Sequence, residues 1–311
     1  MQGSILGWAF FLLRLKSMNP PASVHVPVML DEVIAQLRPS PGTVFIDGTL
    51  GGGGHTRALA ERVAPTGRVI AFDRDPVAIA RARTELATLP VRIVHGSYVE
   101  MREALDGLGI AAVDGVLLDL GLSSDQLADA ERGFSFTAAG PLDLRFDPTE
   151  GQPASEIVNR WGEKQLADAI YQFGEERFSR RIAREIVARR RERLFESAQE
   201  LAELVRRCVP RRPHGERIDP ATRTFQALRI VANDELGALE RTLKILPDCL
   251  KPGGRAAIIS FHSLEDRPVK QDFREDKRWR VLTKKPLRAS DAEVERNPRA
   301  RSAKLRVAER I

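Results

Sequence analysis

Short apolar segments recur along the first half of the chain and alternate with segments of helical spacing. The apolar runs that predict β-strands are Val44–Ile46, Val69–Phe72, Val91–Val94 and Val113–Leu118. Between them, His55–Val63 has helical spacing, and Val77–Leu89 follows Pro76, a residue that the first turn of a helix accepts. Three strand-and-helix steps followed by a fourth strand predict an α/β fold with a parallel, doubly wound sheet.

This alternation stops after Ser124. Residues 125–153 are rich in glycine and proline, which predicts a loop. Three helical patterns follow it, at Glu163–Phe173, Phe178–Arg193 and Ser197–Val209. We therefore expect residues 131–217 to form an inserted helical domain, which would recognise the substrate.

The chain then returns to the sheet. A long amphipathic helix is predicted over Thr224–Leu246 and a fifth strand over Arg255–Phe261. Residues 276–303 are polar and charged, which predicts an irregular surface segment. Residues 24–130 and 218–311 are accordingly expected to form one α/β domain around the insert.

The N-terminal segment has a different character. Ile5–Leu13 is an apolar run that is too short to cross a bilayer and lacks the flanks of a signal peptide. Organised sequence begins soon after Met18, so we expect residues 1–23 to be an extension outside the fold, with Met18 as a candidate translation start. The sequence predicts a cytoplasmic protein without a membrane partner.

The composition is compatible with a polyanionic partner. Of 311 residues, 42% are hydrophobic, and 49 Lys and Arg stand against 43 Asp and Glu, a net charge of +6. Such a balance suits nucleic acid without requiring it. Cys208 and Cys249 form no CxxC pair and lie near no histidine cluster, so neither a disulfide nor a metal site is predicted.

The turn after the first strand is the usual place for a nucleotide-like cofactor in a doubly wound sheet. Here the turn from Asp47 to His55 contains Gly48 and four consecutive glycines, Gly51–Gly54, which let the backbone approach a ligand closely. Asp73 ends the second strand 20 residues after Gly53, a spacing that suits a carboxylate accepting ribose hydroxyls. A glycine-rich turn without a ligand is the alternative.

Two features argue against a dinucleotide. A G-x-G-x-x-G pattern would need its third glycine where Thr56 or Arg57 stands. Asp47 adds a negative charge, which would repel a pyrophosphate but attract the ammonium and sulfonium groups of S-adenosylmethionine. The loop therefore favours S-adenosylmethionine.

Three further side chains follow strand ends. Asp119 ends the fourth strand, at the edge where doubly wound sheets place their chemistry, although a solvated carboxylate is an alternative. Tyr98 follows the third strand and could stack on an adenine or belong to the core. His262 follows the fifth strand and is a weaker catalytic candidate, because a buried structural histidine is the favoured interpretation.

At these positions the sequence resembles the ribosomal RNA small-subunit methyltransferase H family, also called MraW. The resemblance covers about residues 24–310, and many separate motifs in the same order make it more specific than any single loop. The matching motifs are His25–Glu32, Asp47–Thr56, Phe72–Pro76, Leu118–Ser124, Glu131–Phe136, Gly140–Asp143, Gly174–Phe178, Ala221–Ala227, Ser260–Arg267 and Asn297–Ser302.

The resemblance implies a class I, Rossmann-like methyltransferase that uses S-adenosylmethionine to methylate N4 of one cytosine in the decoding region of 16S rRNA, within the small ribosomal subunit. Tyr98 stands where the family often has phenylalanine, and Asp125 stands where some relatives have proline, which could loosen the turn before Gln126. The cofactor contacts that the resemblance implies are Gly53, Gly54, His55, Asp73, Tyr98, Asp119 and Gln126.

The exocyclic amine of cytosine is a poor nucleophile, because its lone pair is delocalised into the ring. Its methylation needs an in-line approach to the methyl group and an acceptor near the N–H. The Pro-Pro-aromatic motif that DNA amino-methyltransferases commonly use is absent, and Asp119, Ser123 and Ser124 occupy its place. Asp119 is therefore the predicted catalytic residue, beside both cofactor and amine.

A cluster of arginines in the helical segment predicts an RNA-binding surface. From Arg177 to Arg193 there are eight arginines and two glutamates, an excess of one sign that argues against a merely solvated helix. The target base should be single-stranded or flipped out of its stack. Further arginines expected on the basic surface are Arg211, Arg212, Arg217, Arg223, Arg296, Arg299 and Arg301.

Three other functions compete with this one. An NAD-dependent oxidoreductase is disfavoured by Asp47 and by the missing third glycine. A non-catalytic ribosome-assembly factor on the same scaffold would show a decayed cofactor loop, and this loop is intact. A methyltransferase for DNA or protein is disfavoured firmly only by the family resemblance.

Overall fold

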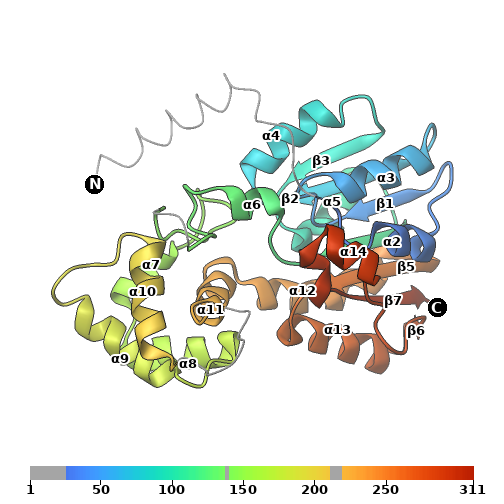
Figure 1. Cartoon of the computed structure of the whole chain (residues 1–311). Coiled ribbons are helices and arrows are strands. Elements are labelled where there is room, and N and C mark those ends of the chain that lie inside the picture. Colours follow the sequence, from blue (N-terminus) through green and yellow to red (C-terminus); the bar gives the residue numbers. More distant parts are fainter. Residues whose placement is uncertain (1–25, 137–139, 211–218) are drawn as a thin grey trace. The chain divides into compact units, whose positions relative to one another are not determined.

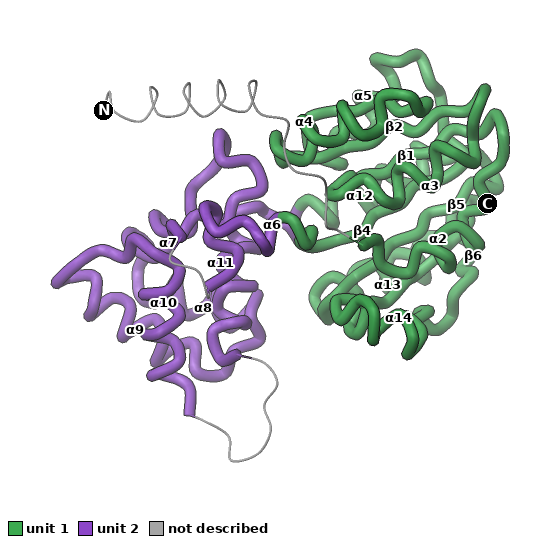
Figure 2. The backbone as a smooth tube through the Cα atoms, turned by 45° about the horizontal axis from the view of Figure 1, so that its top comes forward, with its two compact units in different colours: residues 1–125, 238–311 green, residues 126–237 purple. Residues whose placement is uncertain are grey.

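The structure, a computed structural model, describes residues 26–136, 140–210 and 219–311 (Figure 1). The expected extension, residues 1–23 with Met18, lies outside the described residues. Contacts divide the described residues into two compact units (Figure 2). The first contains the residues up to Asp125 together with Ala238–Ile311, and the second is Gln126–Gly237.

The first unit is built on a seven-stranded sheet in the order β3-β2-β1-β4-β5-β7-β6. The strands β1 to β5 pair in parallel, and β7 runs antiparallel to both its neighbours. The predicted doubly wound α/β sheet is thus confirmed. The strands are β1 (Val44–Asp47), β2 (Arg68–Asp73), β3 (Val91–His95), β4 (Val113–Asp119), β5 (Leu250–Ser260), β6 (Trp279–Val281) and β7 (Lys304–Arg310).

Helices cover both faces of this sheet, which explains why its strands are apolar on both sides. Successive residues of β1 face opposite cores: Phe45 packs with Val33 and Leu59, and Ile46 packs with residues of the other core, such as Leu243. The helices of this unit are α2 (Leu30–Leu37), α3 (Gly54–Val63), α4 (Pro76–Glu85), η1 (Tyr98–Glu100), α5 (Met101–Gly107), α13 (Ser263–Glu275), α14 (Asp291–Arg296) and η2 (Pro298–Ser302). Two further helices, α6 (Ser124–Ala128) and α12 (Glu235–Cys249), include the unit boundaries.

The strand order reverses between β1 and β4, whose carboxyl ends lie side by side. Asp47, the last residue of β1, pairs with Leu117, two residues before Asp119 at the end of β4. Parallel sheets bind ligands at such a reversal point, because the connections leave it in opposite directions. The fold therefore places the glycine loop and Asp119 at one edge.

The segment 276–303 is not irregular, as the sequence had suggested. It contains β6, α14 and η2, and β7 follows it. Trp279 of β6 is buried and packs edge-on against Phe273 of α13, with ring centroids 5.2 Å apart. A three-residue strand is too short to show a period in the sequence, so only its buried aromatic residue could have indicated it.

The second unit is helical, and its three predicted helices are confirmed. Ser197 caps α10 through the expected capping box with Glu200. The long helix predicted over Thr224–Leu246 is wrong, because Asp234 has a left-handed backbone (φ 50°) that separates α11 from α12. The helices are α7 (Ala154–Arg160), α8 (Glu163–Gly174), α9 (Ser179–Arg189), α10 (Ala198–Cys208) and α11 (Thr222–Asn233).

This break also changes the expected domain limits. Helix α11 packs against α8 within the second unit, so this unit extends to Gly237 instead of ending at 217, and it begins at Gln126 instead of 131. The role of the helical unit in substrate recognition stays a prediction.

The loop before α7 is held to α11 by one buried amide. Asn233 Nδ2 donates to the carbonyl of Leu144 at 2.7 Å, and Oδ1 accepts from the backbone N–H of Phe146 at 2.7 Å. Removing this side chain would leave both backbone groups without a partner in a buried position. Each such group costs about 1–3 kcal/mol.

We expect Asn233→Ala to lower the free energy of unfolding by about 2–4 kcal/mol, measured by urea denaturation, because two backbone hydrogen bonds lose their partner. Gln172→Ala, which changes an exposed side chain of the same unit, should stay within about 0.5 kcal/mol of wild type. Equal effects of the two substitutions would contradict this account of Asn233.

Candidate active site

Asp47 organises the glycine loop from inside. Its carboxylate is fully buried and accepts hydrogen bonds from the backbone N–H of Thr49 at 3.1 Å and from the hydroxyl of Thr56 at 2.6 Å. The sequence interpretation, in which Asp47 offers its charge to the ligand, therefore needs correction, since the loop itself uses this carboxylate. Its charge still acts at a distance, because it raises the pKa of Asp73 and Asp119.

Two of the loop glycines, Gly48 and Gly54, stand where a side chain has no room. A Cβ atom on Gly48 would lie 2.4 Å from Leu118 Cδ2 and 2.8 Å from Tyr98 Cβ, and one on Gly54 would lie 2.9 Å from the ring of Pro27. Gly53 has a left-handed backbone (φ 78°) and is the N-cap of α3. The loop thus bends sharply into α3 while it passes close to β4 and η1.

Tyr98 has the predicted contact with the core. It lies in η1, is partly buried, and packs against the core cluster that contains Leu118. It also borders the loop at Gly48. Its ring therefore lies between this core and the glycine loop, and its stacking on an adenine stays a prediction.

Asp73 faces the loop from the end of β2. Its Oδ2 accepts from the backbone N–H of Gly51 at 2.7 Å, and its Oδ1 accepts from the backbone N–H of Asp75 at 2.8 Å. Burial raises the pKa of Asp73 to about 6, and the negative charges of Asp75 and Asp47 add to this effect. A carboxylate in this position is suited to accept ribose hydroxyls once a ligand lies against the loop.

Asp119 and His55 meet at the end of β4. His55 is 4% exposed, its Nε2 lies 3.0 Å from the carbonyl of Val28, and its Nδ1 lies 3.7 Å from Asp119 Oδ2. A carbonyl only accepts, so Nε2 carries a proton and Nδ1 is the nitrogen that faces Asp119. Asp119 Oδ1 is buried and has no hydrogen-bond partner among the described residues.

Charges from four elements act on Asp119. Burial raises its pKa to about 6, His55 of α3 and Arg299 of η2 lower it, and Asp47 of β1 and Glu265 of α13 raise it further. Arg299 also donates to the hydroxyl of Ser124 at 2.9 Å. The sequence had not indicated that Arg299 acts on Asp119, and its place on the RNA-binding surface stays a prediction.

His262 precedes α13 and contacts a residue of the first turn of this helix. It is the N-cap residue of α13, and its Nε2 lies 3.1 Å from Glu265 Oε1. Glu265 Oε2 in turn accepts from the backbone N–H of Phe261 at 2.8 Å. His262 is only partly buried and its ring nitrogens have no hydrogen-bond partner among the described residues, so its structural and catalytic interpretations both stay predictions.

The residues after β4 divide between the two units. Asp125 is the last residue of the first unit and forms an ion pair with Arg81 of α4, in which both side chains are largely buried. The turn is therefore anchored here, whereas the sequence suggested that Asp125 loosens it. Gln126 is buried and begins the second unit, and its contact with the cofactor stays a prediction.

The residues at this edge fit S-adenosylmethionine. The glycine turn is partly exposed, Asp73 accepts a hydrogen bond from its Gly51, and Asp119 Oδ1 has no hydrogen-bond donor among the described residues. An α/β sheet of this strand order with these strand-end groups defines a class I methyltransferase that uses S-adenosylmethionine.

Comparison with known proteins identifies the family. Residues 22–311 match the model described as the MraW methylase family, so the chain belongs to this family and is a methyltransferase. Three similar relatives carry the name ribosomal RNA small subunit methyltransferase H. The Rhodopirellula baltica protein is 56% identical over 92% of this chain and 91% of its own length. The Thermomicrobium roseum protein is 48% identical over 96% and 97%, and the Synechococcus elongatus protein is 50% identical over 95% and 97%.

Several arginines expected to bind RNA have structural partners within the second unit. Arg180 pairs with Asp168, Arg189 and Arg193 with Glu200, and Arg190 donates to the carbonyl of Val158. Exposed arginines without an acidic partner among the described residues of the unit include Arg181, Arg184 and Arg191. Arg211, Arg212 and Arg217 lie outside the described residues.

None of the described helices is both long and apolar enough to cross a membrane.

The raised pKa of Asp119 predicts a pH-dependent gain in stability for Asp119→Asn. A carboxyl group whose pKa is 3.8 when unfolded and about 6 when folded stabilises the fold below pH 4, and this contribution is lost as the pH rises through 6. We expect Asp119→Asn to be up to about 3 kcal/mol more stable than wild type at pH 8 and equal to it at pH 4, in denaturant titrations.

Glu61→Gln is the matched control, because it removes one exposed carboxylate from α3 of the same unit. It should show no such change between the two pH values. A difference between Asp119→Asn and wild type that is the same at pH 4 and pH 8 would refute the burial of an ionised group here.

Proposed function

We propose that this methyltransferase transfers the methyl group of S-adenosylmethionine to the exocyclic N4 amine of a cytosine in the decoding region of 16S rRNA, in the small ribosomal subunit and in the cytoplasm. The names of the relatives support an RNA of the small subunit as substrate. The observation that carries the chemistry is the buried Asp119 Oδ1, an acceptor without a donor among the described residues.

Bound S-adenosylmethionine supplies an electrophilic methyl group. The backbone of the glycine turn would contact the cofactor, Asp73 would accept its ribose hydroxyls, and Tyr98 would stack on its adenine. Gly53, Gly54, His55 and Gln126 complete the proposed set, with His55 acting from the first turn of α3.

Asp119 would accept an N–H of the target amine through Oδ1. This contact concentrates the nitrogen lone pair on the face that attacks the methyl group, and it gives the amine proton a place to go. His55 Nδ1 lies 3.7 Å from Asp119 Oδ2 and stabilises the ionised carboxylate, so the amine proton would be accepted by Asp119 itself. The two side chains therefore act as an acceptor and its electrostatic partner.

Arg181, Arg184 and Arg191 of the helical unit would bind the RNA backbone. Their exposure and their lack of acidic partners among the described residues leave their charges available to phosphates. Charge reversal at these positions tests RNA binding more cleanly than at Arg189 or Arg190, which are engaged within the unit.

The proposed reaction is tested with small subunits from a strain that lacks the enzyme. We expect the purified protein to add one methyl group to a single cytosine, located by mass mapping of nuclease fragments. Asp119→Asn should lower kcat by about 10²–10⁴-fold because the acceptor is lost, while calorimetry shows unchanged affinity for S-adenosylhomocysteine. A product methylated at a ring atom or at another nucleotide would exclude the proposed reaction.

The rate should also depend on pH with a defined sign. Because Asp119 accepts only when ionised and its pKa is about 6, kcat at saturating cofactor should fall about tenfold per pH unit below pH 6 and level off above pH 7. Circular dichroism at each pH would verify that the protein remains folded. A flat profile between pH 5 and pH 8 would remove Asp119 from the proton transfer.

A further inference from the structure

A cavity of the first unit lies outside the site described above. Its volume is about 370 Å³, and buried Phe273 of α13 and partly buried Val281 of β6 form its apolar wall. The basic residues that line it are Lys270, Arg274, Lys284 and Arg306, and we call it the cationic pocket.

The charge of the cationic pocket is not balanced. Lys270, Arg274 and Lys284 are exposed, and none has an acidic partner in the described part of the chain. Arg306 is held by Asp266 through Nε at 2.7 Å and Nη2 at 3.2 Å, and Lys304 lies 3.4 Å from the same carboxylate. Burial would raise the pKa of Asp266, but hydrogen bonds from Arg306 and Lys304 lower it, so one negative charge stands against five positive ones.

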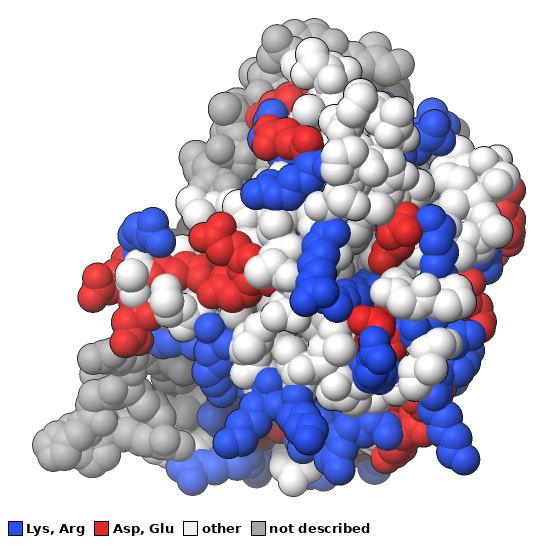
Figure 3. All heavy atoms as spheres, turned by 90° about the vertical axis from the view of Figure 1, so that its right-hand side faces the viewer, with Lys and Arg blue, Asp and Glu red and all other residues white. Residues whose placement is uncertain are grey.

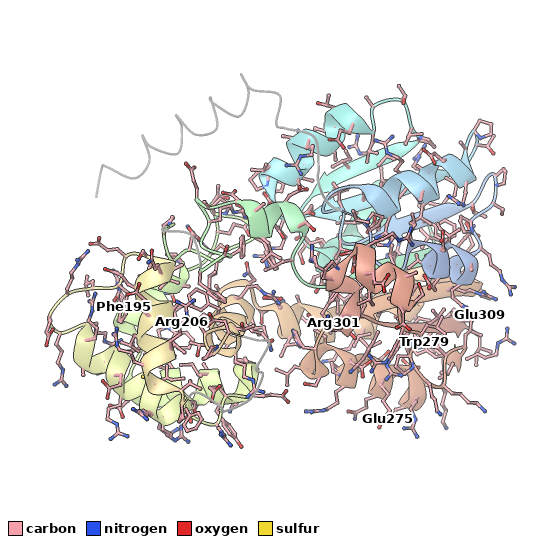
Figure 4. The ribbon with its side chains drawn as sticks, viewed as in Figure 1. Phe195, Arg206, Glu275, Trp279, Arg301 and Glu309 are labelled. Carbon is pink, nitrogen blue, oxygen red and sulfur yellow. The ribbon has the colours of Figure 1, made fainter. Side chains whose placement is uncertain are left out.

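The frame of the pocket is fixed on both sides. The contact between Phe273 and Trp279 joins α13 to β6, and Figure 4 shows Trp279 in β6 and Glu275 at the end of α13. Thr283, which also lines the pocket, accepts from the backbone N–H of Val307 at 2.8 Å. Lys270 and Arg274 are therefore carried by α13 and Arg306 by β7, whereas Lys284 lies in the segment after β6, next to Thr283.

The sheet register places the cationic pocket near the carboxyl ends of the parallel strands, where Asp119 also lies. Ile259 of β5 pairs with both Asp119 and Leu305 of β7, and the chain beyond Val281 runs along β7 until Leu287 bridges to Leu305. Lys284 lies on this stretch. Strands are about 4.8 Å apart, so the pocket is on the order of 15–20 Å from Asp119 across the sheet.

We propose that the cationic pocket binds a phosphodiester group of the same RNA strand that carries the target base, a few nucleotides away from it. This inference rests on the proposed function, which makes the substrate a polyanion. Phosphate contacts set the register of a nucleic acid on a protein, and the apolar wall would take a ribose face. Figure 3 shows Lys and Arg side chains gathered along the lower part of the face on the side of α13 and β6.

The test compares the triple variant Lys270→Gln, Arg274→Gln, Lys284→Gln with wild type. Binding to small subunits that lack the methyl group is measured between 50 and 300 mM KCl. We expect the dissociation constant at 150 mM KCl to rise about tenfold or more, and the slope of log affinity against log salt to become shallower by about 2–3, because three phosphate-facing charges are lost. Affinity for S-adenosylhomocysteine should not change.

The matched control is Arg83→Gln, Arg92→Gln, Lys244→Gln, which removes three exposed charges of the same unit toward the amino ends of the strands. A triple variant that binds like this control, while wild type methylates the subunits, overturns the inference and leaves the proposed function standing. Weaker binding to subunits with unchanged binding to naked 16S rRNA also overturns it, because an acidic protein segment would then be the occupant. A wild-type protein that neither binds nor methylates subunits overturns both proposals.

Discussion

The burial of carboxylates at one edge of the sheet is the constraint on which the site depends. Ionised groups are costly to bury unless hydrogen bonds or opposite charges compensate them. Asp47 is compensated by Thr49 and Thr56, and Asp73 by backbone N–H groups of Gly51 and Asp75. Asp119 is compensated on one side only, by His55 and Arg299, and its Oδ1 stays without a partner among the described residues. The incompletely satisfied carboxylate is the group on which the proposed chemistry rests.

Segments from both ends of the described chain close around this edge. The carbonyl of Val28 orients His55, and the backbone N–H of Met29 donates to Glu293 of α14 at 2.6 Å. Asn297 donates to the carbonyl of Val26 at 3.2 Å, two residues before Arg299. The motifs near residues 26–32 and 297–302 thus act together: one orients the histidine, and the other supplies the arginine beside Asp119.

Some of the positively charged side chains form ion pairs within the protein, and others are left available for a substrate. An excess of arginine in α9 suggested one continuous RNA-binding face, but Arg180, Arg189 and Arg193 form ion pairs within the helical unit. The charges that remain available belong to Arg181, Arg184 and Arg191 in one unit and to the cationic pocket in the other. Each unit would therefore contribute its own contact to a polyanionic strand.

Much of the fold and part of the site followed from the sequence, because the signals are local. Apolar runs, a glycine turn and the carboxylates that end β2 and β4 lie within short stretches whose period fixes their structure. The sequence could not indicate that Asp47 accepts hydrogen bonds from its own loop, or that Arg299 acts on Asp119. It also could not indicate that Asp234 ends α11, the helix that packs against α8. These outcomes depend on groups that meet only after folding, across up to 180 positions between Asp119 and Arg299. Local preference selected the elements, whereas packing and the cost of buried charge decided which side chains remained available for function.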